Sequence, residues 1–229
     1  PPLLFANSDT HFIVHSHNIR VQRSWEQAKA YCRLHKLALY SVQAHDDATR
    51  AEDKGKLTPT ARTALLHYVK PDDTKQIPSF LPLYENMRLL ISTKDCVRFG
   101  IVKGCACKVV SIIFAQDEKL PYEHVAGHEH SLLLMPVSLL LRAEDAKWKL
   151  KNEDLPSSLP PGLDRRGLFQ IRPTHTFIRV KVEDEWITVR RTGFQVMPAD
   201  TITVHTAQGS TFDAVIADMQ RPPNQEPTL

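Results

Sequence analysis

The chain has 229 residues, of which 42% are hydrophobic and 24% charged, and its formal net charge is +3. This composition is ordinary for a globular protein that buries a core, and the weak basicity permits a nucleic-acid partner without requiring one. No apolar run reaches the length of a membrane span, because Pro136 interrupts the longest, Leu132–Leu141. The N-terminus has no basic start or cleavage-like site, so no signal peptide is predicted, and the absence of an initiator Met predicts a piece of a longer chain.

The first 45 residues predict a strand, a helix and a strand. His11–His15 is predicted as a strand, Ser16 as the cap of the following helix, and Leu37–Val42 as a second strand. A helix between two strands predicts a β-α-β unit with parallel pairing. The helix has an apolar stripe of Val21, Trp25, Ala28 and Cys32, with Arg20 predicted to lie off it.

The next segment is charged and rich in proline. His45–Leu57 is predicted as a surface connection. Thr58 and Pro59 are typical of a helix cap and a first helical residue, and predict a short helix that ends near Val69. Ile77–Pro82 is predicted as a linker because prolines bound it.

From Met87 onward the pattern is that of strands. The turn residues Asp184 and Glu185 predict a hairpin between the last two of these strands. The segment from about 142 to 167, rich in Pro, Ser and charge, is predicted as a mobile loop. The predicted strands are Met87–Ser92, Gly100–Lys103, Cys107–Phe114, Ser131–Leu141, Leu168–Ile171, Thr176–Val182 and Trp186–Arg191.

The segment Thr201–Asp218 has the most distinctive pattern in the chain. The alternation in Thr201–His205 predicts a strand, and Ala214–Ala217 predicts a second apolar strand, both buried. Gln, Gly, Ser and Thr form the turn between them. Such a turn offers backbone N–H groups and hydroxyls in a small space, which is the equipment that binds a phosphate.

The order T-x-x-H-x-x-Q-G-x-T followed by an apolar strand resembles the fifth conserved motif of superfamily-1 DNA helicases. Within that superfamily it is most similar to the Pif family and to the helicases of Helitron transposons. Val14–Arg20 resembles the fourth motif of the family, a strand that runs into a helix bearing an arginine, and Tyr84–Gly104 resembles a further family segment. The resemblance covers nearly the whole chain.

The resemblance implies an α/β fold, with a RecA-like parallel-sheet lobe built from both chain ends and interrupted by a β-rich, small barrel-like insertion. Residues 1–79 would begin the lobe, 80–195 would form the insertion, and 196–229 would complete the lobe. Asn18 and Arg20 are implied as secondary site residues. The residues implied to couple DNA to the nucleotide are Thr203, His205, Gln208, Gly209 and Thr211.

The implied activity is that of a 5′-to-3′ DNA helicase, with single-stranded DNA and an N-terminal RecA-like lobe outside this chain as partners. An intracellular, nuclear location follows, with no membrane. The chain has no G-x-x-x-x-G-K-[ST] cradle, no carboxylate pair for magnesium and no arginine-finger segment, so no catalytic residue or cofactor is expected in it. ATP and magnesium are implied for the full-length protein. Thr206 replaces the usual lysine of the motif, which predicts weak DNA affinity.

Two alternatives remain open at the level of sequence. The chain could be a non-catalytic DNA-binding or interaction relic of a transposon-borne helicase. It could also be a metal-binding domain, because His and Glu cluster between residues 123 and 130. The spacing H-x-x-x-H-x-H matches no familiar zinc site, so no metal is predicted. The clustered residues are Glu123, His124, His128, Glu129 and His130.

Overall fold

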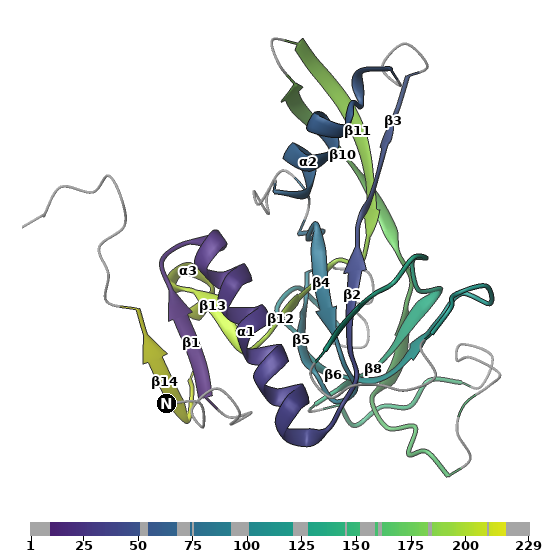
Figure 1. Ribbon diagram of the computed structural model, residues 1–229. Coiled ribbons are helices and arrows are strands. Elements are labelled where there is room, and N and C mark those ends of the chain that lie inside the picture. Colours follow the sequence, from purple (N-terminus) through teal and green to yellow (C-terminus); the bar gives the residue numbers. More distant parts are fainter. Residues whose placement is uncertain are drawn as a thin grey trace, which may run out of the picture.

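The computed structural model describes residues 10–50, 55–67, 74, 76–92, 101–120, 128–144, 146–151, 159, 162–182, 185–209 and 211–218. The described residues form four β-sheets and three helices. A small parallel sheet lies on one side of helix α1 (His17–His35), larger sheets lie on its other side, and a β-arm extends beyond them (Figure 1). No helix in this part of the chain is long and apolar enough to cross a membrane.

The parallel sheet joins segments from near the two ends of the chain. Its central strand β1 (Thr10–Val14) pairs in parallel with β13 (Thr201–Thr203) on one side and with β14 (Ala214–Ala217) on the other. The expected α/β class with a parallel sheet is thus confirmed, whereas the domain boundaries stay predictions. The expected burial of the last strand is wrong: β14 lies at the sheet edge and Val215 is 44% exposed.

Helix α1 begins where the sequence predicts, because Ser16 Oγ accepts a hydrogen bond from the Ile19 amide at 3.3 Å. The predicted position of Arg20 off the buried face is wrong, since this residue is only 8% exposed. The helix packs against β1 and β13 and also against the sheet beyond it, so it buries two faces. Gln27 lies on the buried side as well, and its side-chain oxygen accepts a hydrogen bond from the Thr201 hydroxyl.

The predicted β-α-β unit is wrong in its pairing. Strand β2 (Leu39–Gln43) follows α1 but pairs antiparallel with β4 (Phe80–Leu83) and parallel with β7 (Glu129–Ser131), in the order β4-β2-β7. The sequence pattern predicts a buried strand here without naming its neighbours. The linker predicted over Ile77–Pro82 is also wrong, because it contains most of β4. Pro82 fits there since β4 is an edge strand, where a missing N–H is tolerated.

The largest sheet has five strands, and each neighbouring pair is antiparallel. The predicted strands at 87–92, 107–114 and 168–171 are confirmed to within two residues. The single strand predicted over Ser131–Leu141 is wrong, because β7 and β8 are separate strands and Pro136 lies between them. In sheet order, the five strands are β12 (Val196–Pro198), β5 (Arg88–Ile91), β6 (Ala106–Ile113), β8 (Ser138–Ala143) and β9 (Leu168–Ile171).

Two further predicted segments can be compared only in part. Gly100 lies outside the described residues, and of 101–103 only Ile101 forms a bridge. The segment 142–167 contains the end of β8 and an isolated bridge between Lys149 and Arg166, while residues 145, 152–158, 160 and 161 lie outside the described part. Mobility of this segment stays a prediction.

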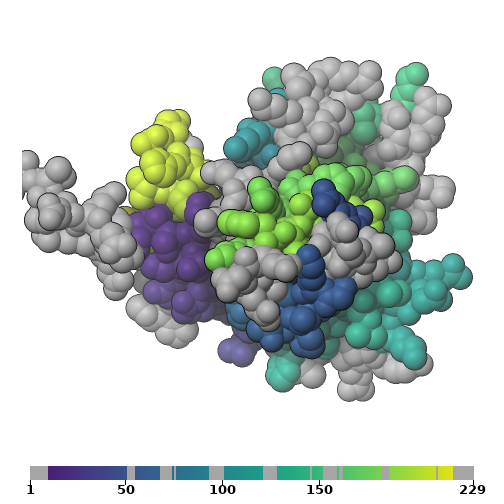
Figure 2. All heavy atoms as spheres, turned by 90° about the horizontal axis from the view of Figure 1, so that it is seen from above, coloured from purple at the N-terminus to yellow at the C-terminus, as the bar shows by residue number. Residues whose placement is uncertain are grey.

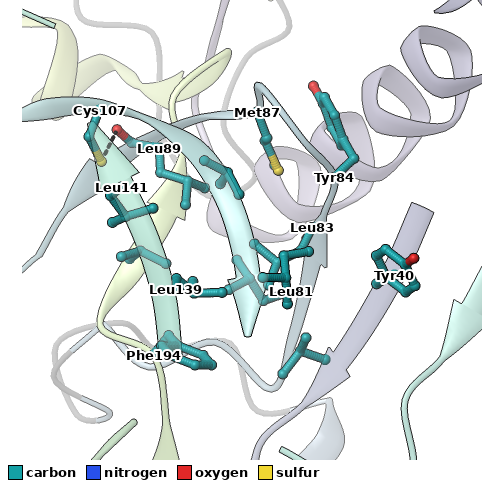
Figure 3. Close-up of a cluster of buried hydrophobic side chains, with 14 of the residues drawn as sticks. Tyr40, Leu81, Leu83, Tyr84, Met87, Leu89, Cys107, Leu139, Leu141 and Phe194 are labelled. Carbon is teal, nitrogen blue, oxygen red and sulfur yellow. Dashed lines mark hydrogen bonds between the residues drawn. The ribbon is translucent and has the colours of Figure 1, made fainter. Parts of the chain in front are cut away.

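The main core lies between α1, the β4-β2-β7 sheet and the five-stranded sheet (Figure 3). Leucines from β4, β5 and β8 face one another there, with Phe194 at one end and Tyr84 near the helix. The Cys107 thiol points into this layer and donates a hydrogen bond to the Leu89 carbonyl at 3.4 Å. Burial raises the pKa of the Cys107 thiol, so the group is neutral and inert in the core.

We call the projecting unit the arm; it consists of β10 (Thr174–Val182), β11 (Glu185–Gly193), β3 (His45–Ala48) and α2 (Pro59–Leu66). The predicted hairpin of β10 and β11 is confirmed, and Thr58 caps α2 as predicted by accepting from the Ala61 amide at 3.2 Å. The helix ends at Leu66, before the predicted end. The inner face of the arm buries Ile178, Val180, Ile187 and Val189 against Leu57 and Leu65.

Strand β3 was predicted as a surface connection, and that prediction is wrong. It pairs antiparallel with β11, although Asp46 and Asp47 disfavour strands intrinsically. The pairing brings each aspartate opposite an arginine of β11. Arg191, fully buried, donates from Nε and Nη2 to the Asp46 carboxylate, both at 2.8 Å. Its guanidinium also donates to Ser79 Oγ at 3.0 Å and to the Leu65 carbonyl at 2.7 Å, which ties four segments together.

Candidate nucleic-acid interface

The motif segment crosses the parallel sheet. Since β13 and β14 lie on opposite sides of β1 and both run parallel to it, the connection between them must cross a face of the sheet, from beside Val14 back to beside Thr10. It does so as a short helix, α3 (Val204–Ala207), followed by a turn in which Gly209 has φ +78°. The strand predicted over Thr201–His205 therefore ends early, and His205 is helical. The left-handed backbone of the turn explains why a glycine stands there.

The predicted site residues divide into one buried and four exposed positions. Thr203 is buried at the end of β13, and its hydroxyl lies 3.0 Å from the Thr206 hydroxyl. This contact lies at the start of α3, and the role of Thr203 in coupling DNA to the nucleotide stays a prediction. The exposed residues are His205, Gln208, Gly209 and Thr211.

The loop borders a cleft of about 810 Å³. The wall opposite the loop belongs to the five-stranded sheet. Of the five predicted residues, Thr211 lines this cleft, whereas His205, Gln208 and Gly209 lie in the same loop but outside the lining. The loop contributes Thr206, Thr211, Phe212 and Asp213 to the cleft.

The sheet side of the cleft has a row of three cations that sequence reasoning missed. Arg88 of β5 is directly opposite Lys108 of β6, and Lys108 is directly opposite Arg142 of β8. All three line the cleft. Each is flanked by buried apolar residues of its own strand, so the alternation alone places a cation on the outward face. Only the strand register, which no sequence pattern shows, brings the three together.

Like charges in adjacent strands repel, and one carboxylate offsets part of this repulsion. Glu144 accepts two hydrogen bonds from Arg88, each at 3.0 Å, and lies 3.8 Å from Lys108 Nζ. Arg142 donates to the Asp164 backbone carbonyl at 2.6 Å. This acceptor is neutral, so it does not offset the positive charge of Arg142. With Glu144 and Asp213 counted, the cleft retains an excess of one positive charge among its described lining residues.

A buried carboxyl lies beside this row. Asp200 directly precedes β13, and its Oδ1 is shielded from solvent without a hydrogen-bond partner among the described residues. Burial raises the pKa of Asp200 to about 6, the Glu144 carboxylate adds to the rise, and the Arg88 guanidinium opposes it. The charge on Asp200 therefore depends on the pH between about 4 and 7, next to the cations of the cleft.

The predicted secondary residues lie elsewhere. Asn18 is exposed on the first turn of α1. Arg20 lines a separate, mainly apolar cavity of about 400 Å³, where its Nη1 donates to the Met197 sulfur at 3.5 Å. Burial lowers the pKa of the Arg20 guanidinium, and no carboxylate among the described residues pairs with it. Arg20 therefore belongs to a different cavity from the one that the motif loop borders, and the secondary role of Asn18 stays a prediction.

The histidine cluster is only partly described, because Glu123 and His124 lie outside the described residues. Glu129 and His130 belong to β7 rather than to a loop. Glu129 pairs with Lys29 at 3.2 Å, and the His130 ring lies 6.2 Å from the Tyr40 ring. Within the described residues, no three His, Cys, Asp or Glu side chains are grouped so as to hold a metal ion.

Comparison with protein-family models gives no match, and none of the curated proteins matches. Among solved structures, the chain is similar to Pif1 helicases. The match with a Pif1 helicase from Candida albicans covers 93% of this chain and 40% of the helicase, at 15% identity and a TM-score of 0.47. Unliganded Pif1 from Bacteroides sp gives 93% and 47% coverage, 12% identity and a TM-score of 0.43. The match with Bacteroides Pif1 bound to ssDNA covers 92% of this chain and 34% of that protein, at 12% identity and a TM-score of 0.48.

These neighbours carry the name of the family that the motif resembles. The chain spans less than half the length of each of them. At 12–15% identity, no residue role is transferred from them to this chain.

Proposed function

We propose that this chain is the second RecA-like lobe, with its β-rich insertion, of a Pif/Helitron-like 5′-to-3′ DNA helicase, and that it holds single-stranded DNA at the motif loop. The observation that carries the proposal is the cation row of Arg88, Lys108 and Arg142 across the cleft from the hydroxyls of Thr206 and Thr211. A basic wall facing threonine hydroxyls is suited to a phosphodiester backbone.

The chemistry favours contact with the backbone of the strand rather than with its bases. Lysine and arginine neutralise phosphates, and threonine hydroxyls donate to phosphate oxygens. Contacts of this kind are blind to sequence, as a translocating motor requires. His205 and Gln208 are exposed in the same loop, outside the cleft lining, and would contact the neighbouring nucleotides.

The residues present do not fit ATP and magnesium, because the sequence has no cradle for the β- and γ-phosphates. No step of hydrolysis is therefore assigned to this chain. In the proposal, an ATP-bearing lobe outside this chain supplies it, and the protein acts on nuclear DNA. Thr206 contributes a hydroxyl in place of the lysine of the family motif, which keeps the net charge of the cleft low.

We expect weak, salt-dependent binding of single-stranded DNA, measured by fluorescence anisotropy with labelled oligonucleotides. Lys108 is 52% exposed, so Lys108→Ala should leave the fold intact and remove one phosphate contact. Affinity should fall, and the slope of log K against log salt should flatten by about 0.7. Lys119→Ala is the matched control at an exposed lysine outside the cleft.

The loop is tested in the same titration. His205→Ala and Gln208→Ala should weaken binding more than His128→Ala and Glu129→Ala, which lie far from the motif in sequence and outside the cleft. Equal effects at all four positions, or tight preference for one base sequence, would contradict the proposed interface.

A further inference from the structure

The arm has an outward face with two large, solvent-exposed aromatic side chains. Successive residues of a strand point to opposite sides, and the inner side of β10 and β11 is apolar and buried. On the outer side, Phe177 is 58% exposed and Trp186 is 57% exposed. Figure 2, which looks down on the arm, shows the atoms of β10 and β11 at the surface beside those of α2. Two large aromatic rings in solvent contribute little to the stability of the arm.

Basic and aromatic side chains alternate on this face. The guanidinium of Arg179 lies 5.2 Å from the centre of the Trp186 ring, a cation–π contact that holds the indole in place. His175 contacts Phe177 edge-on, with ring centroids 5.8 Å apart. The described outward positions of both strands carry no aliphatic side chain; they are His175, Phe177, Arg179, Lys181, Trp186, Thr188, Arg190 and Thr192.

The end of the face nearest His175 is hollowed. A cleft of about 740 Å³ lies there, and Phe177 and His175 line it together with Arg62 of α2 and Arg190 of β11. Phe177 is directly opposite Arg190, and Arg190 pairs with Asp47 at 3.3 Å while both remain about half exposed. An aromatic ring and two arginines therefore border one open space.

We propose that this face of the arm is a second binding surface for single-stranded DNA, with bases stacked on Phe177 and Trp186 and phosphates paired with the arginines around them. Stacking platforms next to cations are how proteins hold single strands without reading sequence. Trp186 is opposite Lys181, four residues along β10 from Phe177, so the platforms are about 13 Å apart along the strand. That separation accommodates a few nucleotides.

Cations next to the two aromatic rings favour a polyanionic strand. Among the described outward residues and those that line the cleft, Arg62, Arg179, Lys181 and Arg190 outnumber the one carboxylate, Asp47. The segment 183–185 that follows β10 adds three acidic residues in sequence, so the binding is expected to be weak and confined to the part of the face described above. This surface is separate from the motif loop, and neither depends on the other.

The test uses the 229-residue chain with two probes, labelled oligo-dT and an abasic oligonucleotide of the same length. Phe177→Ala and Trp186→Ala should each weaken oligo-dT binding by roughly 5- to 150-fold, because a base loses its stacking partner. Neither variant should change binding of the abasic strand, which has no base to stack. Leu133→Ala, at a residue 73% exposed and remote from the arm in sequence, is the matched control.

A thermal melt of each variant shows whether the fold is kept, and Trp186→Phe, which retains a ring, should restore most of the binding. Unchanged oligo-dT affinity in both alanine variants would overturn the proposal and leave the face for a protein partner. So would an equal loss on the abasic strand. If the arm variants lose affinity for oligo-dT while His205→Ala and Gln208→Ala keep it, the arm surface is upheld and DNA binding by the motif loop is contradicted. The two proposals can therefore fail separately.

Discussion

Replacing Arg191 by Ala is expected to lower the free energy of unfolding by about 3–5 kcal/mol. Arg191 is fully buried, and all of its described partners are buried or nearly so. Its removal leaves the Asp46 carboxylate, 7% exposed, without a counter-charge, and also leaves Ser79 Oγ and the Leu65 carbonyl without this donor. An uncompensated buried charge costs more than the lost attraction itself. Urea denaturation followed by circular dichroism measures the change.

The neighbouring pair provides the control within the same strands. Arg190 and Asp47 are also adjacent on β11 and β3 and lie 3.3 Å apart, yet both side chains are at least half exposed. Arg190→Ala should therefore cost less than about 1 kcal/mol. The double replacement Arg191→Met with Asp46→Leu should recover much of the loss, since it removes both charges. Equal destabilisation by Arg190→Ala and Arg191→Ala would show that burial does not set the strength of this pair.

Local signals in the sequence predicted the starts of the two longer helices and one strand pairing. Ser16 and Thr58 cap the helices that they were expected to cap, and β10 and β11 pair as the expected hairpin. These features depend on residues a few positions apart. Strand β3 could not be predicted in this way. Its residue Asp46 is paired with Arg191 of β11, which is 145 positions away in the sequence.

The candidate site shows the same division between local and distant determinants. The motif segment could be singled out from the sequence, since its residues are contiguous and the turn glycine has the positive φ that favours glycine. The opposite wall could not. Lys108 and Arg142 are 34 positions apart in the sequence, and their alignment depends on a register that shifts between Val109 and Ser111. Arg20 shows the same limit. The helical pattern predicts it off the buried face, but the sheet beyond α1, which the pattern does not reveal, buries it.

The second large effect is expected at Asp200, where the fold holds a carboxyl with a pKa of about 6. An unfolded chain gives aspartate a pKa of about 3.9. The folded protein therefore binds the proton more tightly than the unfolded chain. Stability from this group is complete below about pH 4 and is lost as the pH rises through 6. Above pH 7 the ionised, solvent-shielded carboxylate costs a few kcal/mol, roughly the equivalent of two pKa units.

Asp200→Asn should consequently stabilise the protein at pH 8 by up to roughly 3 kcal/mol and have little effect at pH 4, because the amide cannot ionise. The loss of attraction to Arg88 reduces the gain without reversing it, since the net shift of the Asp200 pKa is upward. Urea unfolding at pH 4, 6 and 8 measures the difference, and Asp117→Asn, at an exposed carboxyl, controls for the loss of one negative charge. A difference of the same size at every pH, or a wild-type protein that is the more stable at pH 8, would show that the fold does not raise the pKa of Asp200. If the gain appears, the ionised Asp200 at neutral pH adds negative charge beside Arg88, so the Asn variant should also bind single-stranded DNA more tightly at pH 8 than the wild-type chain does.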